Sequence, residues 1–466
     1  MPPCRDRYDR EHESLVALRG CGIVFLHDIP SYRFPRVTGF RELAREAAAA
    51  IAARPDVRLA LATLVQVDGS SYRQPGARVL VDADGRVLAG AISGGCLEGD
   101  VAARAGEVCA SGRGVRLMYD LRADLETIWG FGAACDGIAH LLLEPLADPS
   151  WLADVEAIRL RRRNGAVLTV LDGHGGGSSC AVLDGDAVTG TWSAIGDQDQ
   201  WLPGPELTVA ARAAQRTGHP MLHDVPNESA LLFIEPLVAP IALQIVGAGR
   251  GADAFVQIAH ALEWEVTVID HRPAVLADLH LPQGVTTLIS RADDAAALAA
   301  VLSSMPHDGR TAIALLSHIF DVDSMWLAAL LPLPVAYIGV LGSRQRAAQL
   351  LDSVNGALGA RGMTVTDKMH HRLHAPIGLD LGGESPASIA LSAIAEIEAV
   401  VHGRPAGFLR ERQSPIHART PTPRAFEHEG PASSLKDPLA TSPGPMSLPT
   451  PIMPAQCDAG LDKRRD

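Results

Sequence analysis

The chain has 466 residues, of which 47% are apolar and 20% charged, as in a globular protein of roughly two to four domains. Only 4% are aromatic, so the cores must rest mainly on alanine, valine and leucine. The net charge of −13 argues against a chain-wide surface for nucleic acid or anionic membranes, because both require basic patches.

Cysteine usage and hydropathy point to the cytoplasm. The seven cysteines are widely scattered and contain no C-x-x-C pair, so they indicate neither a zinc-finger framework nor a secreted disulfide scaffold. No uncharged apolar run is long enough to cross a membrane. The nearest run, residues 231–246, is broken by Glu235, Pro236 and Pro240 and predicts two core strands instead. We therefore expect a cytoplasmic protein with no membrane partner and no nucleic-acid partner.

The first half of the chain predicts an α+β domain. Residues 1–39 have no clear period, and residues 42–53 are helical in composition. Two Asp-Gly pairs, Asp84-Gly85 and Asp184-Gly185, predict β-hairpins, and Gly112 is a plausible helix stop. No internal repeat is evident. We expect strands over 59–67, 78–82, 86–92, 115–121 and 138–143, a helix over 97–108, and mixed elements over 151–236.

The second half alternates between strand and helix patterns, which indicates βαβ units and a parallel sheet. Ser385-Pro386 predicts the start of a last helix that ends near Val401. The expected strands cover 243–246, 265–270, 286–290, 311–316 and 335–340. The fold class is therefore α/β: an extension (1–39), an N-terminal α+β domain (40–237), a Rossmann-like, doubly wound parallel-sheet domain (238–403), and a disordered tail rich in Pro, Ser and Thr (404–466).

The strongest single motif is the glycine-rich turn that contains Gly247, Gly249 and Gly251, between an apolar strand and a helix. It matches the dinucleotide-binding pattern, in which backbone N–H groups bind a pyrophosphate at the helix start. Asp270 ends the next strand, where an acid would bind ribose hydroxyls, and Arg272 beside it would tolerate an extra phosphate. This context indicates the fold more specifically than it indicates a nicotinamide cofactor.

Three further polar clusters follow strands of the second domain, at the sheet edge where such folds bind ligands. His318 follows one strand, Gly342-Ser343-Arg344 opens a helix after another, and residues 375–380 precede Glu384 and the last helix. A satisfied loop histidine and a solvated helix start remain the alternatives for His318 and for Arg344.

In the first domain, the turn Ser93-Gly94-Gly95-Cys96-Leu97-Glu98 places a cysteine near a helix start. Free N–H groups and the helix dipole would favour a thiolate at Cys96, whereas Glu98 and Asp100 oppose it. A small, packed cysteine in a tight turn is the alternative.

Two other loops of the first domain could bind a ligand. Ser70, Ser71, Arg73 and Arg78 flank a turn, and their hydroxyl and guanidinium groups suit phosphate or carboxylate, although a plain surface loop fits these residues too. Cys135 lies in a second glycine-rich loop, residues 130–137, where a structural role is the alternative.

These motifs together resemble the XdhC/CoxI family of xanthine dehydrogenase accessory proteins. The resemblance covers residues 40 to 402. It is carried by residues 69–78, residues 93–100, the Cys135 loop with Glu144-Pro145, residues 247–273, Ser317-His318, residues 337–346 and residues 374–396.

The resemblance implies a maturation factor for molybdenum hydroxylases and not a catalyst. Such a chaperone binds the molybdenum cofactor, as molybdopterin or its dinucleotide form, protects it while a cysteine desulfurase supplies the terminal sulfur, and delivers it to the apo molybdenum hydroxylase. The resemblance implies that Cys96 and Cys135 contact the molybdenum, consistent with soft thiolate ligands, and that the protein is a homodimer. One departure is Asp136, where many members have glycine.

Three alternatives stay open. The glycine-rich motif could serve an NAD(P)-dependent oxidoreductase, with His318 as its one clear proton donor. Cys96 activated by a histidine could act as the nucleophile of a transferase. A purely scaffolding role is the third. Under the leading hypothesis, the Cys96 turn of the first domain and the ligand-binding crevice expected beside Gly247 in the second domain form the two walls of one shared site.

Overall fold

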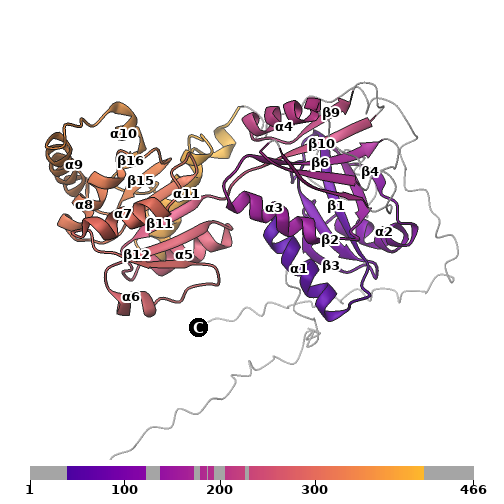
Figure 1. Ribbon diagram of the computed structural model, residues 1–466, viewed down its shortest axis with the longest axis horizontal. Coiled ribbons are helices and arrows are strands. Elements are labelled where there is room, and N and C mark those ends of the chain that lie inside the picture. Colours follow the sequence, from indigo (N-terminus) through magenta and orange to yellow (C-terminus); the bar gives the residue numbers. More distant parts are fainter. Residues whose placement is uncertain are drawn as a thin grey trace, which may run out of the picture.

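The computed structural model describes residues 39–121, 137–172, 179–185, 187–193, 205–225 and 230–413. These residues form two bodies that lie side by side (Figure 1). The first contains two antiparallel sheets, and the second contains one parallel sheet. No helix in the described part of the chain is long and apolar enough to cross a membrane.

The first sheet has five antiparallel strands in the order β3-β2-β1-β5-β4. The Asp84-Gly85 hairpin and the end of α2 at Gly112 (φ 68°) are as predicted. The elements of this half are α1 (Phe40–Ala53), β1 (Leu59–Gly69), β2 (Arg78–Asp82), β3 (Val87–Gly90), α2 (Glu98–Ser111), β4 (Val115–Asp120) and β5 (Gly137–Pro145).

The second sheet repeats this arrangement, with five antiparallel strands in the order β8-β7-β6-β10-β9. Its elements also follow one another in the same sequence of types. They are α3 (Ser150–Leu160), β6 (Gly165–Asp172), β7 (Ser179–Asp184), β8 (Ala187–Ser193), α4 (Pro205–Thr217), β9 (Met221–Val225) and β10 (Ala230–Leu237).

The first body is therefore an internal duplication at the level of structure, although no repeat is evident in the sequence. In register, Leu59 pairs with Asp82 in one sheet and Gly165 with Asp184 in the other. Both aspartates are buried, and each forms an ion pair with an arginine that follows the preceding helix. The repeat escapes notice in the sequence because strand pairing and burial are retained while most side chains differ.

The two sheets pack face to face, with α1 and α3 packed against the core that the sheets share. Leu61 and Leu80 of the first sheet share a core with Val167 and Val182 of the second and with α1 and α3. Helix α2 covers the outer face of the first sheet, and α4 covers the outer face of the second.

The second body has six parallel strands in the order β13-β12-β11-β14-β15-β16, the Rossmann order. The α/β fold class predicted from the sequence is confirmed. The elements are β11 (Ala242–Val246), α5 (Ala252–Ala261), β12 (Glu265–Asp270), α6 (Pro273–Ala277), β13 (Thr286–Ile289), α7 (Ala295–Ser304), β14 (Thr311–Leu315), α8 (Phe320–Leu330), β15 (Tyr337–Val340), α9 (Arg344–Gly359), α10 (Asp367–Arg372), β16 (Leu373–His374), α11 (Pro386–Val401) and a 3-10 turn (Leu409–Glu411).

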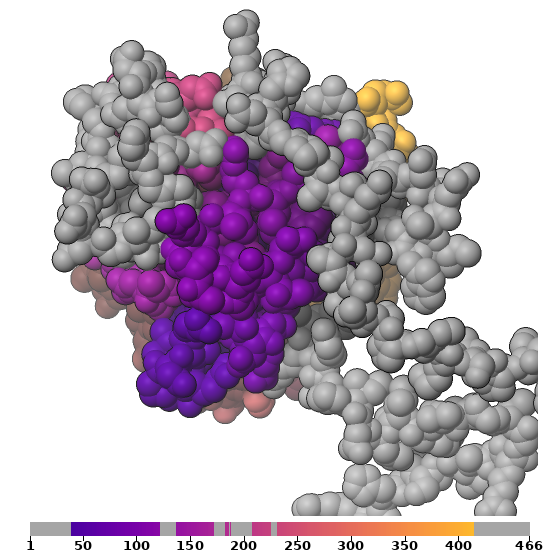
Figure 2. Space-filling view, turned by 90° about the vertical axis from the view of Figure 1, so that its right-hand side faces the viewer, coloured from indigo at the N-terminus to yellow at the C-terminus, as the bar shows by residue number. Residues whose placement is uncertain are grey.

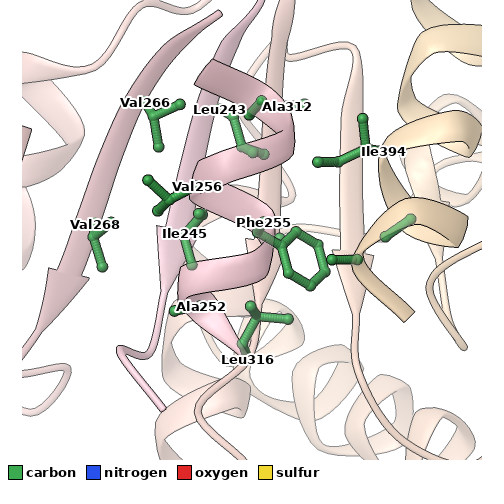
Figure 3. Packing of buried hydrophobic residues seen from close by; sticks show 14 of the residues in the cluster. Leu243, Ile245, Ala252, Phe255, Val256, Val266, Val268, Ala312, Leu316 and Ile394 are labelled. Carbon is green, nitrogen blue, oxygen red and sulfur yellow. The ribbon is translucent and has the colours of Figure 1, made fainter. Parts of the chain in front are cut away.

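Buried helix faces fix the parallel sheet on both sides. On one side, Phe255 of α5 lies between the sheet and Ile394 of α11 (Figure 3). On the other side, Val301, Trp326 and Leu350 anchor α7, α8 and α9. The central strands β11, β14 and β15 are buried along their whole length because both faces of the sheet are covered.

The two bodies meet at the amino ends of the parallel strands. Arg162, in the turn after α3, donates to Asp308 at 2.7 and 3.0 Å, to Glu265 at 2.6 Å and to the Pro240 carbonyl at 2.9 Å. The Gly39 N–H donates to Glu263 Oε2 at 3.1 Å. The carboxyl edge of the Rossmann sheet therefore faces away from the first body.

Candidate functional site

The cysteine turn is built around the buried carboxylate of Glu98. One oxygen accepts the N–H groups of Ile92 (2.9 Å) and Ser93 (2.8 Å), and the other accepts the Ser93 hydroxyl. Ser93 Oγ in turn accepts the N–H groups of Gly95 and Leu97 at 3.0 and 3.1 Å. Burial opposes ionisation of Glu98, but these hydrogen bonds outweigh it and lower its pKa. Glu98 therefore supports the turn through both of its carboxylate oxygens.

Cys96 lies on this rigid turn as a free, partly buried thiol, two residues before α2. Among the described residues the backbone beside it is open, because a Cβ at Gly95 would meet none of their atoms within 4 Å, and Gly95 has a φ of 112°. The neighbouring acid that was expected to oppose a thiolate, Asp100, is engaged by Arg104 at 2.8 Å and by the Tyr119 hydroxyl at 2.5 Å.

The loop after β1 lies against this turn. Tyr72 is 66% exposed, and its ring lies 4.0 Å from where a Cβ of Gly94 would be. Arg73 is half-buried, which lowers its pKa, and its guanidinium has no acidic partner within ion-pair distance among the described residues. Ser70 is exposed and Ser71 half-buried. An aromatic face, a guanidinium and a thiol thus lie on adjacent loops.

The second predicted cysteine, Cys135, lies outside the described residues. The described chain resumes at Gly137, which packs so closely on the loop after β1 that a Cβ would lie 2.5 Å from the Ser70 carbonyl oxygen. Only glycine fits there.

Arg78 has a structural role, contrary to the ligand-binding role predicted for it. The side chain is only 4% exposed and forms an ion pair with Glu235 of the second sheet, with 3.0 Å between Nη1 and Oε1. Its guanidinium also lies 4.6 Å from the centre of the Phe40 ring. Arg78 therefore joins the two halves of the duplication.

The glycine-rich turn of the second body lies at the point where strand order reverses, between β11 and β14. Gly247 has a φ of 106°, and a Cβ there would lie 2.7 Å from the Ser317 nitrogen. A Cβ at Gly249 or at Gly251 would instead meet no atom of the described residues within 4 Å. A crevice of about 360 Å³ opens at this edge, lined by Gly247, Asp270, Arg272 and Ser317 among others.

Asp270 accepts hydrogen bonds at both oxygens. The Ala248 N–H donates at 2.7 Å, and Arg272 donates through its N–H (2.9 Å), Nε (2.9 Å) and Nη2 (2.8 Å). Burial alone would raise the pKa of Asp270, but these bonds hold it at about 2. The two residues predicted to bind a cofactor thus bind each other.

His318 projects from the same edge in a strained conformation, with a φ of 60° and an exposed side chain. The preceding Ser317 hydroxyl donates to the fully buried Asp323 at 2.5 Å, and Arg346 donates to the other Asp323 oxygen at 2.7 Å. Asp323 and Arg346 thus tie the His318 turn to the start of α9. In the sequence, Asp323 and Arg346 belong to two separate polar clusters that follow two different strands, and only the tertiary structure pairs them.

The remaining predicted residues lie at the start of α9 and in the loop before α11. Ser343 caps α9 by accepting the Arg346 N–H at 3.2 Å, and Arg344 is exposed. Gly342 has a φ of 152°, which favours glycine, and a Cβ there would lie 2.7 Å from Arg346 Cδ. Glu384 is exposed in the loop before α11. None of these four residues lines the crevice.

The structure does not bring the two predicted walls together. Helix α2, which follows Cys96, lies on the side of the first body away from the second (Figures 1 and 2). The Gly247 crevice opens at the carboxyl edge, away from the interface held by Arg162. Among the described residues, no group of three or more His, Cys, Asp or Glu side chains could hold a metal ion.

These features define a class: a duplicated antiparallel double sheet followed by a Rossmann domain of the nucleotide-binding order. Residues 43–120 match the XdhC and CoxI family, and residues 243–397 match the XdhC Rossmann domain. The chain belongs to the XdhC/CoxI family.

Three relatives show how far the similarity extends. A Bacillus subtilis (strain 168) protein described as a probable xanthine dehydrogenase subunit is 28% identical over 338 residues, which cover 72% of this chain and 91% of the relative. A Bacillus halodurans crystal structure described as a xanthine dehydrogenase aligns with a TM-score of 0.60 and 25% identity, over 78% of this chain and 96% of that one. The uncharacterized protein YqeB of Escherichia coli (strain K12) is 30% identical over 174 residues, 37% of this chain and 30% of the relative.

Proposed function

We propose that the protein takes part in the maturation of a xanthine dehydrogenase-type molybdenum hydroxylase by carrying the molybdenum cofactor as cargo. Family membership and the similarity to a probable xanthine dehydrogenase component support the link to that enzyme. The chaperone role is the finer part of the proposal, and it rests on the cysteine turn.

The observation that carries the chaperone role is the free Cys96 thiol on a rigid, open turn. Thiolate is a soft ligand that suits a sulfur-ligated metal. The exposed Tyr72 ring would stack against a flat heterocycle, and the Arg73 guanidinium would bind its phosphate. In this proposal the chain's residues bind and shield the cargo, a cysteine desulfurase and the apo-enzyme are the partners, and no side chain acts as a catalyst.

The test is co-expression with molybdopterin synthesis, followed by measurement of bound molybdenum and of oxidised pterin fluorescence. Cys96→Ser is expected to lose most of both signals. Cys109→Ser is the matched control, since Cys109 is also free and partly buried but donates to the Leu59 carbonyl at 3.3 Å. Equal loading of the two variants and of the wild type would remove Cys96 from the proposal.

An NAD(P)-dependent oxidoreductase is the second candidate, favoured by the Rossmann strand order and the glycine-rich turn. The hydrogen bonds that Asp270 already accepts from Ala248 and Arg272 argue against this activity. The Asp270 carboxylate would have to accept the ribose hydroxyls of the nucleotide instead. Calorimetric titration of the purified protein with NAD and NADP tests this second candidate, and the absence of binding would remove it.

A further inference from the structure

A buried hydroxyl without a partner lies in the crevice of the Rossmann domain. Ser290 follows β13, is 5% exposed and lines the crevice, and its Oγ has no hydrogen-bond partner in the described part of the chain. Its N–H donates to the Asp270 carbonyl at 3.1 Å, which fixes the residue beside the end of β12. Buried hydroxyls are almost always hydrogen-bonded, so this one points to a group that binds in the crevice.

Two guanidinium groups line the same crevice in matching arrangements. Arg272 pairs with Asp270, and Arg291 pairs with Asp293 at 2.9 and 2.7 Å, each through Nε and Nη2. These pairs orient the guanidinium planes, and in the described part of the chain Nη1 of each arginine remains for another acceptor. Arginines fixed in this way are suited to bind the oxygens of a phosphate.

Asp270, the acid that would have to bind the ribose of a dinucleotide, has no lone pair left to accept another hydrogen bond. A carboxylate offers about four lone-pair sites. Asp270 already accepts four hydrogen bonds, three of them from Arg272 and one from the Ala248 N–H. A ribose diol could bind there only if the Arg272 side chain moved away.

We propose that Ser290, Arg272 and Arg291 form an oxyanion subsite that takes a phosphate group and excludes the ribose diol of a dinucleotide. In this subsite Ser290 donates its hydroxyl hydrogen to a phosphate oxygen, and Asp270 positions Arg272. The subsite goes beyond the proposed function, because none of its residues contacts the cysteine turn. Its test can therefore fail while the chaperone proposal survives, and the reverse also holds.

The experiment is calorimetric titration of the full chain with inorganic phosphate at constant ionic strength and, separately, with NAD. The wild type is expected to bind phosphate and not NAD. Ser290→Ala should weaken phosphate binding severalfold without lowering the melting temperature, since it removes a hydroxyl that has no partner. Ser303→Ala, on the exposed face of α7, is the matched control and should bind phosphate as the wild type does.

Arg272→Ala should lose phosphate binding and gain NAD binding, because two Asp270 oxygens become available to the diol. Arg291→Ala removes the same charge from the same crevice but leaves Asp270 occupied, so it should weaken phosphate binding without gaining NAD. NAD binding by the wild type that Arg272→Ala weakens would overturn the proposal. Absent phosphate binding by the wild type, or unchanged phosphate binding by Ser290→Ala, would overturn it as well.

Discussion

Arg78 forms an ion pair with Glu235 and none with Glu144, although the two glutamates occupy equivalent places in the duplicated sheets. Glu144 pairs in register with Leu61, and Glu235 pairs with the equivalent Val167. Each is followed by proline and leucine. Of the two equivalent glutamates, therefore, only Glu235 has the arginine as its ion-pair partner. Ionised Glu144 should consequently lower the free energy of unfolding.

Glu144→Gln should stabilise the protein at alkaline pH. Burial raises the pKa of Glu144 from 4.5 to about 7, and Arg78 offsets only part of this. The folded state therefore binds this proton more tightly than the unfolded chain, so stability falls as pH rises from about 4.5 to 7 and is level above that. At pH 8 the variant should gain about 1–3 kcal/mol in the free energy of unfolding, and at pH 4.5 almost nothing.

Urea denaturation at several pH values measures this difference. Glu235→Gln is the control, and it should destabilise at neutral pH because it removes the partner of the buried Arg78. A loss of stability in Glu144→Gln at pH 8 would contradict the prediction.

Glu98→Gln should loosen the cysteine turn. A glutamine cannot accept all of the hydrogen bonds that Ile92 and Ser93 donate, so about 1–3 kcal/mol of stability should be lost at neutral pH. Because folding lowers the pKa of Glu98, the wild type's advantage exists above the unfolded value of 4.5 and disappears as pH falls through the folded pKa.

The rate at which iodoacetamide alkylates Cys96 reports on the turn directly and should rise in Glu98→Gln. Asp100→Asn is the matched control, since it changes a nearby acid that binds Arg104 and Tyr119 and not the turn. Equal alkylation rates in Glu98→Gln and the wild type would show that Glu98 does not hold the turn.

His318→Gly should be more stable than His318→Ala by about 1 kcal/mol. The φ of 60° is strained for alanine and histidine and not for glycine. If the imidazole contacts a ligand, both variants should lose ligand binding to the same extent, because both lack the ring. The two variants would then differ in stability but not in binding. Thermal denaturation and ligand titration of the two variants make the comparison, and equal stability would argue against strain at this turn.

Arg162→Ala should weaken the attachment of the two bodies. It removes the side chain that donates to Asp308, Glu265 and the Pro240 carbonyl, at a cost of about 1–3 kcal/mol for a mostly buried charge with partly exposed partners. Scanning calorimetry should resolve two unfolding transitions that overlap more in the wild type. Arg161→Ala is the control and should behave as the wild type. Arg161 is the neighbouring residue, but its side chain is exposed and its one ion pair among the described residues, with Asp184, is long at 3.8 Å.

Local patterns predicted most elements closely. The limits of β2, β12 and α11 agree with the sequence-based ranges, and Leu231–Val246 divides into two strands, β10 and β11, as expected. These features depend on periodicity, turn residues and helix caps, which act over a few neighbours in the chain. The duplication was missed because equivalent positions retain burial and register more than residue identity.

By itself the sequence determined the fold class, the two kinds of sheet, the glycine-rich turn and the cysteine turn. Tertiary structure alone decided which polar groups remain available. Arg78 is paired with Glu235, 157 residues away, and Asp270 accepts hydrogen bonds from Arg272 and from the Ala248 N–H. The Ser290 hydroxyl has no hydrogen-bond partner among the described residues. It also decided that the Cys96 turn and the Gly247 crevice lie apart in one chain. The reason is physical: a side chain's polarity follows from its type, but its hydrogen-bond partners and burial depend on packing between distant segments.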